Sequence, residues 1–186
     1  MIERIDTDKS YNPIREHLRI QAILKTVENK NKEIINLING GGFDPKLSRI
    51  LIFCTKRDDT ESLAEYLNEN SNWSFKDKIK AFHAGMTGEE RSHLYREFLM
   101  GDIPILVATK AFGMGMDIPN IHGIYHMDPP SSLEDYLQEV GRAGREKNMY
   151  LKAGYSEQNP IKCLIIANSN DFKIIRDRQH RGAISF

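Results

Sequence analysis

Two arginines set among glycines are the side chains of this sequence best suited to phosphate chemistry. Arg142 and Arg145 lie within the segment QEVGRAGR, residues 138–145. A guanidinium group is planar, stays charged at any relevant pH and matches the oxygen atoms of a phosphate. Gly141 and Gly144 leave room for another backbone or a ligand to come close. The segment indicates an anion-binding site, with a solvated arginine pair after a helix end as the alternative.

A predicted amphipathic helix leads into this segment. Pro129 and Pro130 end the preceding stretch, and Ser131 with Glu134 has the spacing of a capping box. Apolar side chains then recur at helical spacing, at Leu133, Tyr136, Leu137 and Val140. If the helical turn continues past the glycines, the opposite face carries Gln138, Arg142 and Arg145.

Helical patterns alternate with short apolar runs along the rest of the chain. The runs that predict buried strands are 49–54, 79–82, 105–108, 123–127 and 162–167. Helices are expected at 16–27, around 34–38, after the first strand and at 171–181. Another begins at a capping box formed by Thr87 and Glu90 and ends at Gly101. Residues 109–119 and 146–160 are expected to be irregular.

This alternation predicts an α/β fold of three layers, a mostly parallel sheet with helices on both faces. Ligands of such sheets bind at the carboxyl ends of the strands. The loops expected there are 54–58, 83–87, 109–119 and 128–132. We expect one compact domain over 49–186, with 1–48 as a helical lead-in packed on it.

Composition limits the classes of partner. The 186 residues include 26 basic and 26 acidic side chains, so any contact with nucleic acid must be a local patch. The two cysteines, Cys54 and Cys163, are far apart, which argues against a disulfide framework and a metal site. The chain has no long apolar run or signal-peptide pattern, so we expect a cytoplasmic protein without a membrane partner.

Four segments together resemble the motifs of one family. Residues 50–57 look like motif IV, HAGM at 83–86 like a histidine turn, 107–120 like motif V and 138–145 like motif VI, QxxGRxxR. Their order and spacing resemble the second, C-terminal RecA-like domain of superfamily 2 helicases. The sequence AFGMGMD within motif V is most similar to that motif of the RecQ-like ATP-dependent DNA helicases.

The resemblance implies that this sequence contains only the second of the two RecA-like domains that form the motor. A GxxxxGK[ST] phosphate loop and an acidic Walker B segment, which this family places in its first RecA-like domain, do not occur in the sequence, and neither does a cysteine-rich zinc module. We therefore expect part of a longer protein, inactive alone, in which ATP and Mg²⁺ are bound mainly by that first domain.

The family also implies roles for the arginine segment. Arg145 corresponds to an arginine finger, Arg142 to a phosphate ligand or a tie to the sheet, and Gln138 to a contact with nucleotide or the other domain. Gly115 is implied to belong to the nucleotide-binding site, and Asp117 is implied to couple ATP, through the ribose or the arginine motif, to the DNA side. The alternative for Asp117 is a turn residue before Pro119.

Further residues are implied to grip single-stranded or duplex DNA through its backbone: Thr55, Lys56, His83, Gly85, Thr109 and Lys110. His83 is alternatively a turn histidine, Lys56 part of a solvated charge cluster, and Phe112 is expected in the core. The expected function is the second motor domain of a DNA helicase moving 3′ to 5′. The alternatives are an RNA helicase domain and a non-catalytic nucleic-acid-binding module; the oligomeric state is left open.

Overall fold

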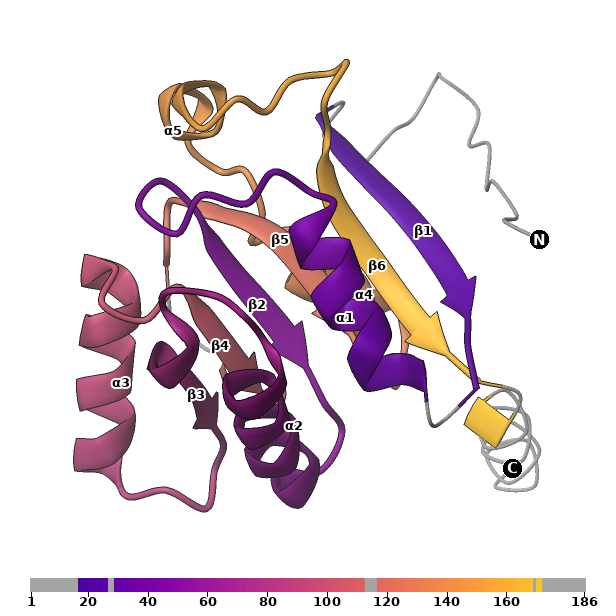
Figure 1. Ribbon diagram of the computed structural model, residues 1–186, viewed down its shortest axis with the longest axis vertical. Coiled ribbons are helices and arrows are strands. Elements are labelled where there is room, and N and C mark those ends of the chain that lie inside the picture. Colours follow the sequence, from indigo (N-terminus) through magenta and orange to yellow (C-terminus); the bar gives the residue numbers. More distant parts are fainter. Residues whose placement is uncertain (1–16, 27–28, 113–116, 169, 172–186) are drawn as a thin grey trace.

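A six-stranded sheet forms the centre of the molecule (Figure 1). The computed structural model describes residues 17–26, 29–112, 117–168 and 170–171. All strand pairs are parallel, in the order β1-β6-β5-β2-β4-β3. The strands are β1 (Leu18–Leu24), β2 (Arg49–Phe53), β3 (Ile79–Phe82), β4 (Ile105–Ala108), β5 (Ile121–His126) and β6 (Ile161–Ala167).

Helices cover both faces of this sheet, which confirms the predicted three-layer α/β fold. They are α1 (Lys30–Asn39), α2 (Arg57–Asn70), α3 (Gly88–Met100), α4 (Leu133–Val140) and α5 (Lys147–Lys152), with a short 3₁₀ turn η2 (Lys76–Lys78). In Figure 1, α1 and α2 lie in front of the sheet and α4 behind it.

Two hydrophobic cores lie on opposite faces of the sheet, because successive side chains of a strand point to opposite faces. In β2, Ile50 and Ile52 pack with α1 and α2, whereas Leu51 and Phe53 pack with the side of α3, α4 and α5. Phe112 is 1% exposed and makes edge contacts with Phe82 and Phe98, so its expected place in the core is confirmed.

The signals at both ends of α3 are confirmed. Glu90 N donates to Thr87 Oγ1 at 3.2 Å, and Thr87 N donates to Glu90 Oε2 at 2.7 Å, which completes the capping box. These bonds lower the pKa of Glu90, because they favour its carboxylate form. Gly101 ends the helix with a φ of 97°.

The helix expected over 16–27 is wrong, because residues 18–24 form β1. This edge strand pairs in parallel with β6, Leu18 opposite Ile161 and Leu24 opposite Ala167. Leu18 and Ile20 pack on one core and Ile23 on the other. A strand that contributes apolar side chains to both faces lacks the strict alternation that separates strands from helices in a sequence.

Two further local predictions are corrected. The N-cap of α4 is Ser132 rather than Ser131, since Ser132 Oγ accepts a hydrogen bond from Asp135 N at 3.0 Å. Leu133 is therefore 71% exposed and outside the apolar stripe. Residues 146–160 are also not wholly irregular, because they contain α5.

Of the helix expected at 171–181, all but Asp171 lies outside the described residues. In the described part of the chain, no helix is long and apolar enough to cross a membrane.

Candidate functional site

The loops that follow the central strands meet at one edge of the sheet. Cys54 N donates to Ala108 O at 2.9 Å, and Thr109 N donates to Phe82 O at 3.0 Å. On the other side of β2, Met127 N donates to Phe53 O at 2.8 Å. The sheet order thus places the loops after β5, β2, β4 and β3 side by side, as expected for parallel strands.

The residues expected to bind nucleic acid lie along this edge, but only some of their side chains are exposed. Thr55, Lys56 and Lys110 are exposed. Thr109 is buried, and its hydroxyl accepts a hydrogen bond from Ala111 N at 3.4 Å.

His83 is almost fully buried, and both of its ring nitrogens are engaged. Nε2 lies 2.8 Å from Glu61 Oε1, and Nδ1 accepts a hydrogen bond from Gly85 N at 3.2 Å. The His83 side chain therefore shapes its own turn, which favours the alternative interpretation of this histidine.

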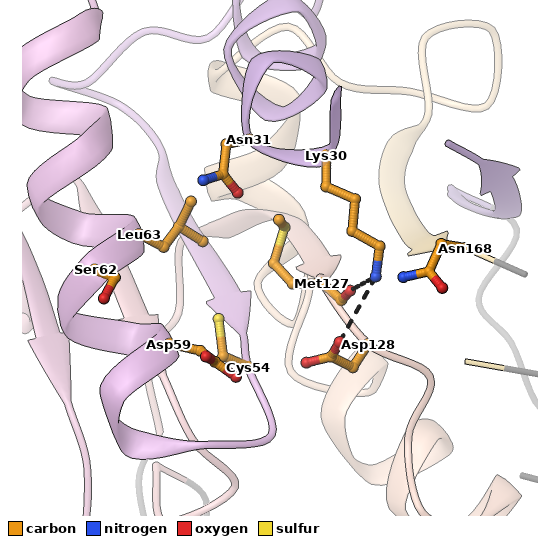
Figure 2. Close-up of a pocket in the computed structure, with 9 residues that line it drawn as sticks. All are labelled: Lys30, Asn31, Cys54, Asp59, Ser62, Leu63, Met127, Asp128 and Asn168. Atoms are coloured by element: carbon orange, nitrogen blue, oxygen red, sulfur yellow. Dashed lines mark hydrogen bonds and ion pairs between the residues drawn. The ribbon is translucent and has the colours of Figure 1, made fainter. Parts of the chain in front are cut away.

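A buried lysine of α1 contacts the segments that follow β5 and β6, beside a cavity of about 290 Å³ (Figure 2). Lys30 Nζ donates to Met127 O at 2.5 Å and to Asp171 Oδ2 at 2.7 Å, and lies 3.6 Å from Asp128 Oδ1. The other carboxylate oxygen of Asp128 accepts from Thr55 N at 3.3 Å. Lys30 thereby holds the aspartate that fixes the loop after β2.

A second cavity of about 190 Å³ adjoins the first, because Cys54 and Asp128 line both. Its walls include Thr55, Lys110, Asp135 and Glu139. The crevice lies where β2 leads to a helix on one face and β5 to a helix on the other, the usual ligand position of an open parallel sheet. Burial, and then the charges of Asp128 and Asp59, raise the pKa of Cys54, so its thiol stays protonated and is a poor nucleophile.

A buried histidine ties α4 to the end of β5 under this cavity. His126 Nε2 lies 2.8 Å from Glu139 Oε2. The ring stacks on Phe53 with centroids 5.1 Å apart. The predicted site residues did not include His126, Glu139, Lys30 and Asp128. Lys30 and Asp128 meet only because of the sheet order, and the pairing of His126 with Glu139 depends on how α4 packs against the end of β5.

The arginine segment forms a separate cluster at the far end of α4. Arg145 forms an ion pair with Asp117, and its Nε donates to Gly141 O at 3.2 Å. Arg142 is half-buried, and burial together with the nearby charge of Arg145 lowers its pKa. The Asp117 side chain is 73% exposed, and Tyr95 Oη donates to the Asp117 main-chain oxygen at 3.4 Å.

The structure therefore brings together Arg142, Arg145 and Asp117, as the sequence led us to expect of neighbours in one site. Gln138 is exposed on α4, and Gly115 lies outside the described residues. The cluster is not at the carboxyl edge: Gly144 N donates to Ile121 O at 2.9 Å, at the start of β5. Two fixed cations and an exposed carboxylate suit a nucleotide, whose phosphates are anionic and whose ribose offers hydroxyl donors.

Comparison with known proteins assigns the class of this domain. The model of the helicase conserved C-terminal domain matches residues 29–147, and the chain belongs to this family. It is 32% identical over 160 residues to the human ATP-dependent DNA helicase Q4, a match that covers 78% of this chain and 13% of that protein. The similarity to RecQ-like DNA helicases is therefore confirmed.

One sequence relative is named as an RNA helicase, and one solved structure with the same fold is bound to RNA. The putative ATP-dependent RNA helicase R290 of Acanthamoeba polyphaga mimivirus is 31% identical over 156 residues, 81% of this chain and 27% of that protein. The solved structure of Mss116p DEAD-box helicase domain 2 bound to an RNA duplex has a TM-score of 0.64 at 21% identity, over 90% of this chain and 60% of that one. The chain thus spans only 13% of the length of helicase Q4 and 27% of the length of R290.

Proposed function

We propose that this chain is the second motor domain of an ATP-dependent, RecQ-like DNA helicase that moves 3′ to 5′. The observation that carries the proposal is the cluster of Arg142, Arg145 and Asp117 in a chain of the helicase C-terminal family. A first RecA-like domain would supply the phosphate loop, hold ATP and Mg²⁺, and face this cluster across a cleft.

Arg145 acts in this proposal as the arginine finger. Its guanidinium offsets negative charge that develops on the transferred phosphoryl group, an effect typically worth roughly 10³–10⁵ in rate. The ion pair with Asp117 holds the side chain outside the core, where 34% of it is exposed. Arg142 and Gln138 border the same nucleotide, and Asp117 links it to the loop after β4.

The carboxyl edge of the sheet forms the track for a single strand. The hydroxyl of Thr55 and the ammonium groups of Lys56 and Lys110 are exposed there and suit phosphate oxygens. His83 and Thr109 contribute by shaping the loops, given their local hydrogen bonds. Backbone contacts of this kind carry no base sequence information.

The test of the finger is Arg145→Ala in the two-domain protein. We expect DNA-stimulated ATP turnover to fall by about 10³-fold or more, with ATP binding largely kept. Arg96→Ala, which removes an exposed arginine from α3, is the matched control and should retain turnover. Unchanged turnover in Arg145→Ala would show that the finger is wrongly assigned.

The isolated chain should neither hydrolyse ATP nor unwind DNA, because it carries no phosphate loop. A phosphate-release assay with and without DNA checks this expectation, and DNA-stimulated hydrolysis by the chain alone would contradict it.

An RNA helicase domain is the second candidate, favoured by the viral relative, which is named as an RNA helicase. Turnover of the two-domain protein with single-stranded DNA or with RNA of the same sequence separates the two. Binding of either strand without any ATP turnover would instead favour the non-catalytic module.

A further inference from the structure

The turn between α4 and Arg145 is packed against distant parts of the chain. Its last residue, Gly144, has a φ of 56°. A Cβ atom placed on Gly144 would lie 2.5 Å from His17 Nε2 and 2.7 Å from Ile161 Cδ1. The turn therefore fits directly against the segment that enters β1 and against the start of β6.

His17 fixes one side of this turn. Its Nε2 atom donates to the main-chain oxygen of Gly144 at 3.0 Å, a bond that an imidazole with hydrogen on Nε2 makes whether neutral or protonated. The ring stacks on Tyr150 of α5, with centroids 4.1 Å apart and planes 18° apart. The His17 main-chain oxygen accepts from Ile161 N at 2.8 Å. The donor is thus held in place by its ring and by its backbone.

The oxygen that His17 holds belongs to the peptide group leading into Arg145. Because a peptide group is planar, fixing the Gly144 carbonyl also fixes the direction of the Arg145 N–Cα bond. The Gly144 nitrogen is bound on the other side by Ile121 O. The backbone from which the Arg145 side chain extends toward Asp117 is therefore set by two hydrogen bonds to other elements.

We propose that His17 is a positioning residue for Arg145, an inference that rests on the proposed role of Arg145 in ATP turnover. His17 touches no reacting group and acts through the Gly144 peptide. Its hydrogen bond narrows the range of backbone directions at Arg145, which keeps the guanidinium near one geometry. His17 and Gly144 are 127 positions apart in the sequence, so folding brings this hydrogen bond to Arg145 from a distant part of the chain.

Variants of His17 separate the hydrogen bond from the stacking. His17→Phe keeps a ring on Tyr150 but removes the donor, and His17→Gln restores an N–H donor without the ring. In the two-domain protein we expect His17→Phe to lower kcat roughly five- to tenfold, the upper range for one neutral hydrogen bond, with KM for ATP changed less than about twofold. His17→Gln should recover most of the loss. His93→Gln, at an exposed histidine of α3, should match the wild type.

A second readout uses this chain without ATP. The NMR signal of the Arg145 Nε–H group should shift or broaden in His17→Phe and return in His17→Gln. Trp73 fluorescence reports whether each variant folds, and His17→Met provides another donor-free variant if His17→Phe does not fold.

The outcomes distinguish the role of Arg145 from the role of His17. If Arg145→Ala keeps full turnover, the proposed role of Arg145 fails and this inference with it. If Arg145→Ala abolishes turnover while the folded donor-free variants keep wild-type kcat and the Arg145 signal, the role of His17 is overturned and the finger stands. Equal losses in His17→Gln and His17→Phe would likewise overturn it.

Discussion

Arg49 is a charged residue used as part of the core. Its Nε donates to Phe98 O at 3.1 Å, and its Nη1 donates to Pro45 O and Ser48 O at 3.0 and 2.9 Å. Burial lowers its pKa. The guanidinium lies where a side chain at position 101 would be, since a Cβ added to Gly101 would lie 1.8 Å from Arg49 Nη2. Arginine and glycine therefore depend on each other here.

We expect Gly101→Ala to lower the free energy of unfolding by about 2–4 kcal/mol. The left-handed backbone costs an alanine about 1–2 kcal/mol, and displacing the guanidinium adds the loss of buried hydrogen bonds. Gly154→Ala is the control, because Gly154 also has a positive φ of 84° but open space around it, and should cost only the backbone contribution of about 1–2 kcal/mol. Urea denaturation measures both; equal costs would show that Arg49 adapts freely.

His122 makes stability depend on pH. Burial, and then the charges of Arg49 and His17, lower its pKa to about 4, and its Nδ1 lies 3.0 Å from Ser48 Oγ. Between the ordinary pKa near 6.5 and 4 the unfolded chain binds the proton and the folded one does not. Stability therefore falls as pH drops through this window.

The expected loss from His122 is about 2–3 kcal/mol between pH 7 and pH 4. His122→Gln should reduce the pH dependence of the unfolding free energy over this range, whereas His93→Gln at an exposed position should not. Parallel curves for wild type and His122→Gln would contradict a depressed pKa of His122.

At the scale of the element, the start of α4 offers a test within one dipeptide. Ser132 Oγ accepts from Asp135 N, and the neighbouring Ser131 is exposed and outside the cap. Ser132→Ala should cost about 1 kcal/mol of unfolding free energy, and Ser131→Ala close to nothing. Thermal or urea unfolding distinguishes the two; a larger loss in Ser131→Ala would return the N-cap to the position predicted from sequence.

Elements with one clear signal could be predicted from the sequence. The run RILIF and the capping box at Thr87 are local patterns, so β2 and α3 were predicted correctly. β1 was not, because it is an edge strand whose stability comes from pairing with β6, 143 positions away at Leu18 and Ile161. α5 was missed because it has six residues and one buried side chain, Tyr150.

At the scale of the whole molecule, part of the candidate site could likewise be predicted from the sequence and part could not. The family motifs placed Arg142, Arg145 and Asp117 in one site, and the structure brings them together. Lys30 with Asp128, and His17 with Gly144, could not be predicted, since each contact depends on which strands are neighbours in the sheet. A short motif specifies its own residues but not the distant ones that hold them.

Because β1 pairs with β6, we expect the lead-in to unfold with the rest of the domain as one cooperative unit, and Ile20→Asp tests this. Ile20 packs on the core shared with α3, α4 and α5, and the single tryptophan, Trp73, packs on the opposite face of the sheet. Fully burying an isoleucine is worth about 1.5–3 kcal/mol, and Ile20 is partly buried, so the aspartate should lower the global unfolding free energy by about 1–2 kcal/mol.

Because the sheet joins both faces, the urea midpoint seen by Trp73 fluorescence should move as far as that seen by circular dichroism. Ala22→Asp, at an exposed position of the same strand, should move neither much. A shift in circular dichroism alone, with the Trp73 transition unchanged, would mean that the lead-in unfolds separately. His17 would then hold Arg145 only while β1 stays paired with β6, and the positioning of Arg145 would be lost by local opening of β1 before the rest of the domain unfolds.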